Sequence, residues 1–306
     1  MKKINWGIIG LGNIAHEFSK AFAETNNAKL LAISSKDKNK LKKFKLQFNI
    51  DSKFSFNNYQ DLINCDEVDI VYIALPNSLH KQWILNAIKN KKNILVEKPA
   101  TINFSEANEI KDNLKKTNIF FSEAFMYRYH PQIQSVIKII KDNKIGNLLS
   151  MESSFGEDIL TKKKLFFFMK KKKIDPKSRK FDKGLGGGCI LDLGCYPSSF
   201  SLLIGSLKNK SNMNSFEIKN VLIEKGETGV DIDSAAELSF QDGFKSKIHA
   251  SYKKNLGSKS LIHGEKGTIL LNKSWSGGNI IIHLKRNSKQ KISFANNKNI
   301  YSYQIE

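Results

Sequence analysis

Arginine, cysteine and long apolar runs are scarce in this sequence, and each scarcity excludes a class of protein. Only three of its 50 basic residues are Arg, which disfavours a protein that reads nucleic-acid bases through bidentate guanidinium groups. Its three cysteines lack the spacing of metal ligands, which indicates reduced thiols in a cytoplasmic protein. No apolar run approaches the roughly 18 residues of a membrane-spanning helix. A soluble globular chain is therefore expected, with no metal, membrane or nucleic acid as partner.

Lysine is what the sequence has in excess. The 306 residues include 50 basic and 29 acidic ones, which gives a formal net charge of +21. The lysines are spread along the chain among many asparagines, a composition typical of AT-rich genomes. We interpret the charge as ordinary solvated surface, and an anionic partner is the alternative.

The first 125 residues alternate short apolar runs with helical patterns. This alternation predicts a parallel sheet with right-handed helical crossovers. The expected strands are residues 4–10, 30–35, 68–75, 94–97 and 119–124, and the expected helices are residues 14–25, 38–48, 78–90 and 105–116.

From residue 126 the pattern changes to one helix, over residues 133–140, followed mainly by strands. Hairpins are expected to turn at Asp242-Gly243, around residues 264–267 and at Asn287-Ser288. A basic insert around Phe166-Phe167-Phe168 is expected to be a mobile loop. The predicted fold class is therefore α/β, with a doubly wound Rossmann sheet over residues 1–125. An α+β domain with a mostly antiparallel open sheet is predicted over residues 126–306.

A glycine motif joins the first expected strand to the first helix. Gly10 permits a tight turn, Gly12 lets the backbone approach a pyrophosphate, and Ala15 allows close packing of helix on strand. The helix then begins at Asn13 and Ile14, where N–H groups and the positive end of the helix dipole favour phosphate. The motif predicts dinucleotide binding.

The end of the second expected strand indicates which dinucleotide is bound. An acidic residue there would hold the ribose 2′-hydroxyl of NAD, but the strand ends in Ser34, Ser35 and Lys36. A hydroxyl followed by a cation suits a 2′-phosphate, which favours NADP(H). NAD(H) stays possible, because Asp37 could serve as the ribose acceptor.

Two further segments could carry chemistry. Lys98 stands between Glu97 and Pro99 at the end of an expected strand, on the edge of the sheet where ligands of open α/β folds bind. Asp192 and Tyr196 lie four residues apart in an apolar segment that follows three glycines, so a helix would present both on one face. A buried tyrosine and an aspartate at a helix N-terminus would also account for this pair.

Together these motifs resemble the Gfo/Idh/MocA family of NAD(P)-dependent oxidoreductases over essentially the whole chain. Inositol dehydrogenase-like members have His at the position of Tyr196. A tyrosine there resembles the branch of dimeric dihydrodiol dehydrogenase, glucose-fructose oxidoreductase and xylose dehydrogenase-like enzymes. The motifs that carry the resemblance are Gly10-x-Gly12, Leu75-Pro76-Asn77-Ser78-Leu79-His80, Glu97-Lys98-Pro99, Glu123 to Pro131 and Gly186 to Pro197.

The resemblance implies a catalytic pair, Lys98 and Tyr196, with Asp192 supporting it. These three residues and Arg179 would contact the substrate. The residues that would contact the cofactor, beyond the glycine motif, Ser35 and Lys36, are Leu75, Pro76, Asn77, His80, Glu97, Lys98 and Arg128.

The implied reaction is reversible hydride transfer between NADP(H) and a secondary alcohol or ketone of a sugar, polyol or dihydrodiol. Tyr196 would move the hydroxyl proton, and Lys98 beside it would favour the phenolate or stabilise the alkoxide directly. Asp192 is the alternative proton carrier. A non-catalytic NAD(P)(H)-binding sensor or scaffold is the alternative function. A homodimer or tetramer is expected, and relatives usually continue beyond the position of Glu306, which predicts a missing closing element.

Overall fold

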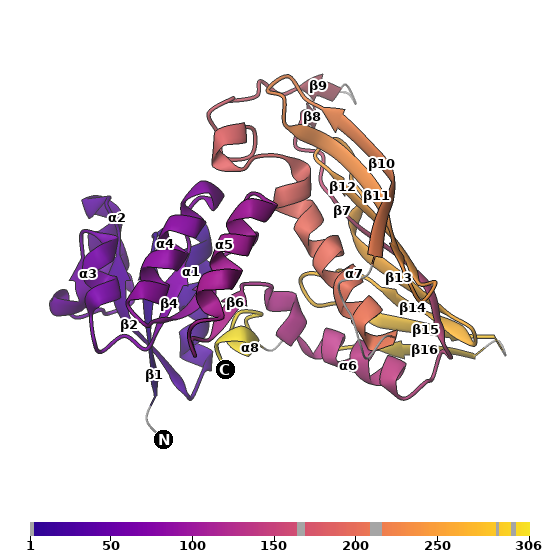
Figure 1. The fold of residues 1–306 in the computed structure, drawn as a ribbon, viewed down its shortest axis with the longest axis horizontal. Helices are drawn as coiled ribbons and strands as arrows, with labels where there is room; N and C mark the ends of the chain where they lie inside the picture. Colours follow the sequence, from indigo (N-terminus) through magenta and orange to yellow (C-terminus); the bar gives the residue numbers. More distant parts are fainter. Residues whose placement is uncertain (1–2, 164–168, 209–215, 286–287, 295–297) are drawn as a thin grey trace. The chain divides into compact units, whose positions relative to one another are not determined.

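The computed structural model describes residues 3–163, 169–208, 216–285, 288–294 and 298–306. The chain forms two compact units, whose secondary structure is drawn in Figure 1. Unit 1 comprises Met1–Met126 together with Asn297–Glu306, and unit 2 comprises Tyr127–Asn296. The sequence prediction placed everything after residue 125 in one domain, whereas the residues from 297 onward pack with unit 1.

Unit 1 is built on a parallel sheet of six strands. In spatial order the strands are β3 (Ser55–Phe56), β2 (Ala28–Ser34), β1 (Ile4–Ile9), β4 (Ile70–Ile73), β5 (Asn93–Val96) and β6 (Phe121–Glu123). The order reverses between β1 and β4, as in doubly wound dinucleotide-binding folds. All four residues of β4 are buried, as expected for a strand that is covered on both faces. The predicted Rossmann sheet is confirmed.

Helices connect these strands, and short polar side chains start several of them. Asp37, Asn58 and Asn103 each accept hydrogen bonds from backbone N–H groups in the first turn that follows, as N-capping residues do. The strand β3 and the helix α3 were not predicted from the sequence. The helices are α1 (Asn13–Lys20), α2 (Lys38–Gln47), α3 (Tyr59–Asn64), α4 (Asn77–Lys89) and α5 (Phe104–Leu114).

The end of the chain packs on the core of unit 1 through the short helix α8 (Ser302–Ile305). Tyr301 makes an edge contact with Phe18, with 6.0 Å between ring centroids, and Ile305 joins the same apolar cluster. The carboxylate of Glu24 accepts hydrogen bonds from the Asn299 N–H at 2.6 Å and from the Ser302 hydroxyl at 3.3 Å. Unit 1 therefore consists of two segments that are distant in sequence.

Unit 2 contains a mixed sheet of eight strands. Among the described strands of this sheet, the pairing of β7 with β12 is the parallel one and the others are antiparallel, so the predicted mostly antiparallel sheet is confirmed. The three predicted hairpins pair as β11–β12, β13–β14 and β15–β16. In spatial order the strands are β10 (Phe216–Lys225), β11 (Asp231–Phe240), β12 (Lys245–Ser251), β7 (Leu148–Gly156), β13 (Gly257–Gly264), β14 (Gly267–Leu271), β15 (Ile280–Leu284) and β16 (Ser288–Ile292).

Two helices, α6 (Pro131–Lys141) and α7 (Cys195–Lys208), accompany this sheet. Helix α6 starts at the N-cap His130 and buries Ile133, Val136 and Ile139 at helical spacing. Helix α7 lies along one face of the sheet (Figure 1), where the Ser201 and Ser246 hydroxyls share a hydrogen bond of 2.6 Å.

Two sequence predictions need correction in unit 2. The helical segment Lys183–Lys208 is long and apolar enough to cross a membrane, although no such segment was expected; 56% of its most apolar window is buried, as in the core helix of a folded domain. The basic insert contains a two-stranded hairpin, β8 (Thr161–Lys163) and β9 (Met169–Lys171), where a loop was expected. Its central phenylalanines, Phe166 to Phe168, and the turn residue Asn287 lie outside the described residues.

Candidate functional site

The glycine motif forms the turn between β1 and α1. Gly10 has φ +90, and a side chain there would collide with the Ala74 carbonyl, so glycine is required by both conformation and space. A Cβ on Gly12 would meet no atom within 4 Å, and Gly12 is the N-cap of α1 without a side-chain cap. Open space above uncapped N–H groups, which continue through Asn13 and Ile14, fits a pyrophosphate.

The end of β2 presents one hydroxyl and one cation. The Ser35 hydroxyl accepts a hydrogen bond of 3.1 Å from the Asp37 N–H, while Lys36 is exposed with its ammonium 5.6 Å from the centroid of Tyr59. Asp37, the alternative ribose acceptor, uses Oδ1 to cap α2 through the N–H groups of Asn39 and Lys40. Its carboxylate is thus partly committed to the helix.

The turn between β4 and α4 contains the predicted cofactor residues Leu75, Pro76, Asn77 and His80. Leu75 is buried, Pro76 is exposed and is the N-cap of α4, and Asn77 opens that helix. His80 is fully buried. Its Nε2 lies 2.8 Å from the Leu75 carbonyl and its Nδ1 lies 2.9 Å from the Pro99 carbonyl.

His80 therefore lies between the carbonyls of two loops at the same edge of the sheet. Burial lowers its pKa, although both carbonyls favour the protonated ring. A neutral imidazole donates only one N–H, so the ring engages one of the two carbonyls as a donor. This gives His80 a supporting position, and a direct contact with a cofactor stays a prediction.

Lys98 follows β5, and side chains from β4 and β6 hold its neighbours in place. The Tyr72 hydroxyl of β4 donates to the Glu97 carboxylate, and the Ala100 N–H donates to Glu123 Oε1 at 2.9 Å. The Lys98–Pro99 peptide is cis. Because β1, β4 and β5 are adjacent and parallel, the glycine turn, the Pro76 turn and Lys98 share one edge of the sheet.

Each of the three glycines before Asp192 occupies a position where a larger residue would be strained or would collide with a neighbour. Gly186 ends a short helix with φ +77, and a side chain on Gly187 would collide with the Lys180 carbonyl. Gly188 has φ +115, and its Cβ would overlap Oδ1 of Asp231. The glycines thus let the chain pass tightly between the segment at Lys180 and the start of β11.

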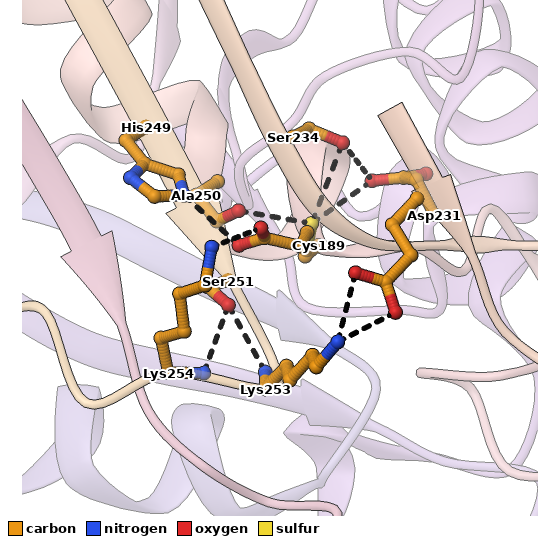
Figure 2. A network of polar contacts seen from close by, with 10 residues as sticks. Cys189, Asp231, Ser234, His249, Ala250, Ser251, Lys253 and Lys254 are labelled. Atoms are coloured by element: carbon orange, nitrogen blue, oxygen red, sulfur yellow. Dashed lines mark hydrogen bonds and ion pairs between the residues drawn. The ribbon is translucent and has the colours of Figure 1, made fainter. Parts of the chain in front are cut away.

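Figure 2 shows how the next residue, Cys189, is anchored on β11 and β12. Its thiol lies 3.1 Å from the Asp231 carboxylate and 3.3 Å from the Ala250 carbonyl. The Ile190 N–H donates to Asp231 Oδ2 at 2.7 Å. Burial, followed by the nearby carboxylate of Asp231, raises the pKa of Cys189, so the thiol stays protonated. Cys189 is therefore a structural donor within this cluster.

Asp192 lies in a π-helical turn, Ile190–Gly194, where the sequence predicted a regular helix. A π-turn closes over five residues, so the four-residue spacing to Tyr196 does not place the two side chains as in an α-helix. The Tyr252 hydroxyl lies 3.0 Å from Asp192 Oδ2. Lys180 Nζ is 3.7 Å from the same oxygen, and Arg179 is 3.8 Å from Oδ1.

Tyr196, in the first turn of α7, sits among aromatic rings and is 6% exposed. Its ring centroid lies 5.4 Å from Phe155, 5.6 Å from Trp275 and 6.0 Å from Tyr127. These contacts fix the plane of the phenol ring, which is what a positioned proton carrier requires.

The two predicted arginines differ in what they contact. Arg128 donates to the Ser199 carbonyl at 3.0 Å and to the Ser199 hydroxyl at 2.8 Å, so it ties the segment after β6 to α7. Arg179 is 62% exposed and faces Asp192. Arg128 therefore has a structural contact that the sequence did not reveal, and its predicted contact with the cofactor stays a prediction.

Comparison with known proteins identifies the family. Residues 4–125 match the model "Oxidoreductase family, NAD-binding Rossmann fold" of Gfo/Idh/MocA, and residues 133–270 match the Gfo/Idh/MocA C-terminal domain. The chain belongs to the Gfo/Idh/MocA oxidoreductase family. The predicted family is confirmed, and a catalytic oxidoreductase is favoured over a non-catalytic binding protein.

Individual relatives span nearly the whole chain. A trans-1,2-dihydrobenzene-1,2-diol dehydrogenase of Xenopus tropicalis is 27% identical over 98% of this chain and 87% of its own length. The crystal structure of an aldose-aldose oxidoreductase from Caulobacter crescentus, complexed with glycerol, has a TM-score of 0.84 at 22% identity, covering 99% of this chain and 88% of that one. A 3-ketoreductase from Actinomadura kijaniata, in complex with NADP and TDP-benzene, has a TM-score of 0.81 at 21% identity, with coverage of 99% and 88%.

Sequence reasoning missed the residues that hold the candidate residues in place. Tyr72 binds Glu97, Asp231 binds the backbone of Ile190, and Tyr252 binds Asp192. None of the three belongs to a motif, and each pair is separated by 25 or more residues. No local pattern in the sequence could have indicated them.

Proposed function

We propose that this protein transfers a hydride between NADP(H) and a secondary alcohol or ketone on a sugar, polyol or dihydrodiol-like substrate. One observation carries the proposal: the open glycine turn and Lys98 lie at the same edge of one parallel sheet, beside the reversal of strand order. The names of the dihydrodiol dehydrogenase and the sugar-related oxidoreductases among its relatives support the substrate class.

The proposed roles follow from the chemistry of each side chain. The Gly10–Gly12 turn and Lys36 would hold NADP⁺, which would supply the hydride acceptor for the carbinol carbon. Tyr196 takes the hydroxyl proton as that hydride leaves, and Lys98 stabilises the negative charge that develops on the oxygen. Asp192 supports this pair, and Arg179 contacts the substrate.

The function is tested by assaying the full chain with NADP⁺ against sugars, polyols and dihydrodiols, following the absorbance of the reduced nicotinamide. We expect turnover with at least one class and none without the cofactor. Tight binding of NADP(H) with no turnover across the panel would instead favour the sensor or scaffold.

We propose a cytoplasmic location on the composition alone.

The cofactor preference is expected to depend on Lys36. The protein should bind NADP(H) at least about tenfold more tightly than NAD(H), the gain typical of hydrogen bonds to a charged group. Lys36→Asp should abolish or invert this preference, because a carboxylate repels a 2′-phosphate and accepts from a ribose hydroxyl. Isothermal titration with both cofactors measures the effect. Lys43→Asp, on the exposed surface of α2, is the charge-matched control, and equal affinities of the unmodified protein for both cofactors would refute the preference.

We also propose that the protein dimerises through the sheet face opposite α7. Acidic and basic side chains alternate there around apolar ones, which suits a two-fold interface that pairs a surface with itself. The residues lining a hollow of about 570 Å³ include Glu152, Ala235, Glu237, Lys247, Lys259, Leu261 and Leu270.

Leu222→Asp tests this proposal, because Leu222 on β10 pairs with Ala235 and is 70% exposed, so folding should tolerate the change. Sedimentation velocity should show a dimer for the unmodified protein and mainly monomer for the variant. The exposed Lys43→Asp change should leave the dimer intact. A monomeric unmodified protein would contradict the proposal.

A further inference from the structure

Tyr252 is a fully buried residue directly after β12, with its backbone fixed on both sides. Its N–H donates to the Ile232 carbonyl at 2.7 Å, and its carbonyl accepts from the Ile159 N–H at 2.9 Å. Its hydroxyl lies 3.0 Å from Asp192 Oδ2 and 3.2 Å from the Gly188 carbonyl. Both acceptors belong to the glycine-rich segment, so the Tyr252 hydroxyl contacts that segment at the Asp192 carboxylate and at the Gly188 carbonyl.

The basic residues Arg179 and Lys180 approach Asp192 only at ion-pair distance. Arg179 is 62% exposed and Lys180 a third exposed, and both lie beyond 3.5 Å from the carboxylate, too far for good hydrogen bonds. Lys180 also lies 5.4 Å from the centroid of the Tyr252 ring, and Phe181 packs on that ring at 5.7 Å. Tyr252 thus makes a short contact with Asp192 from the interior of the unit.

The hydroxyl is a reliable donor. Burial, and then the negative charge of Asp192, raise the pKa of Tyr252, so the phenol keeps its proton. The neighbouring thiol of Cys189 also stays protonated. A hydrogen bond from a neutral buried donor to a carboxylate stabilises the charged form of that carboxylate.

We propose that Tyr252 is a positioning residue for the reaction. By binding Oδ2, it fixes the rotamer of Asp192 and keeps the carboxylate ionised, so that Oδ1, the oxygen nearer to Arg179, faces the substrate. The inference rests on the proposed function of Asp192. It adds a residue outside every motif of the chain, 60 positions from the aspartate that it orients.

Tyr252→Phe keeps the buried ring and removes only the hydroxyl. We expect kcat/KM to fall about ten- to a hundredfold, the range for losing a hydrogen bond to a charged group, while the NADP(H) dissociation constant is unchanged. The acidic limb of the pH profile should move to higher pH, because a carboxylate that loses a donor is more easily protonated. A merely structural role would not move that limb.

Two comparisons isolate the effect. Ser246→Ala on β12 removes a different buried hydrogen bond, to Ser201, and should leave both kcat/KM and the pH profile unchanged. In an Asp192→Asn background, Tyr252→Phe should add little further loss, because the two residues act on one another.

The outcomes separate this inference from the function on which it rests. If Asp192→Asn lowers turnover while Tyr252→Phe leaves kcat/KM and the pH profile unchanged, the positioning role is overturned and the proposed function stands. If Asp192→Asn is fully active, the role of Asp192 fails and the inference fails with it. Should Tyr252→Phe not fold, 3-fluorotyrosine at position 252 keeps the hydroxyl and makes it a stronger donor. The acidic limb of the pH profile of the 3-fluorotyrosine protein should then lie at lower pH than that of the unmodified protein. An unmoved limb would overturn the inference.

Discussion

Replacing Lys98 by Met is expected to lower turnover by about 10²- to 10⁴-fold while NADP(H) binding survives. Met keeps an unbranched side chain of similar length but has no charge to stabilise the developing alkoxide. The neighbouring contacts of Tyr72 with Glu97 and of Glu123 with Ala100 do not involve the Lys98 ammonium, so the loop should keep its shape. Steady-state kinetics and cofactor titration measure the two quantities separately.

Tyr196→Phe should produce a loss of the same order, because it removes only the hydroxyl from a ring held by Phe155 and Trp275. If Lys98 and Tyr196 act as one unit, the double variant should be little worse than the worse single variant. In the oxidation direction, activity of the unmodified protein should rise with pH, and Tyr196→Phe should erase that limb, which belongs to the coupled pair.

Tyr127→Phe is the matched control for this variant. Tyr127 is a fully buried tyrosine whose centroid lies 6.0 Å from Tyr196, and its hydroxyl lies 3.0 Å from that of Ser199. Losing that hydroxyl should affect stability by about 1 kcal/mol and leave the pH profile unchanged. Full activity of Tyr196→Phe with an unaltered pH profile would show that Asp192 or a water molecule moves the proton.

Among alanine substitutions of Gly186, Gly187 and Gly188, Gly188→Ala is expected to destabilise unit 2 most. The new Cβ would overlap Asp231 Oδ1, and φ +115 strains any L-residue. Backbone strain of about 1 to 3 kcal/mol adds to about 1 to 3 kcal/mol for disrupting the buried hydrogen bonds of Asp231. The sum, about 2 to 6 kcal/mol, is a large part of the 5 to 15 kcal/mol that stabilises a typical protein. Denaturant unfolding measures it.

Gly229→Ala separates the strain from the overlap. Gly229 also has positive φ, +80, but a Cβ there meets nothing within 4 Å. Its replacement should therefore lower the free energy of unfolding by only about 1 kcal/mol. Equal effects at the two positions would show that the close approach of Asp231 to Gly188 does not matter for stability.

The elements that the sequence predicted well are those with a strong periodic or glycine signal. The strand β4 is a continuous apolar run and β1, β2 and β5 are mostly apolar, while Gly10 and Gly12 mark the first crossover. These signals were enough to predict the Rossmann sheet. The two-residue strand β3 and the short α3 were missed, because each is shorter than the window in which periodicity can be recognised.

The candidate site was predictable in its residue types but not in its geometry. The spacing of Asp192 and Tyr196 predicted an α-helical face, yet Asp192 lies in a π-turn, because backbone geometry near Gly188 and Gly194 depends on contacts with distant strands. His80 could be recognised from its motif, whereas its burial between two carbonyls depends on loops that meet only in the folded unit.

The return of Asn297–Glu306 to unit 1 has a consequence for the order of biosynthesis. When residue 126 leaves the ribosome, all six strands of the first sheet are available, but Tyr301 and Ile305, which cover the side of Phe18, have not been made. Unit 2 is translated in full before they arrive. The apolar cluster around Phe18 therefore gains these two packing partners only after all of unit 2 has been translated, and apolar surface that waits for its partners is prone to aggregation in that interval.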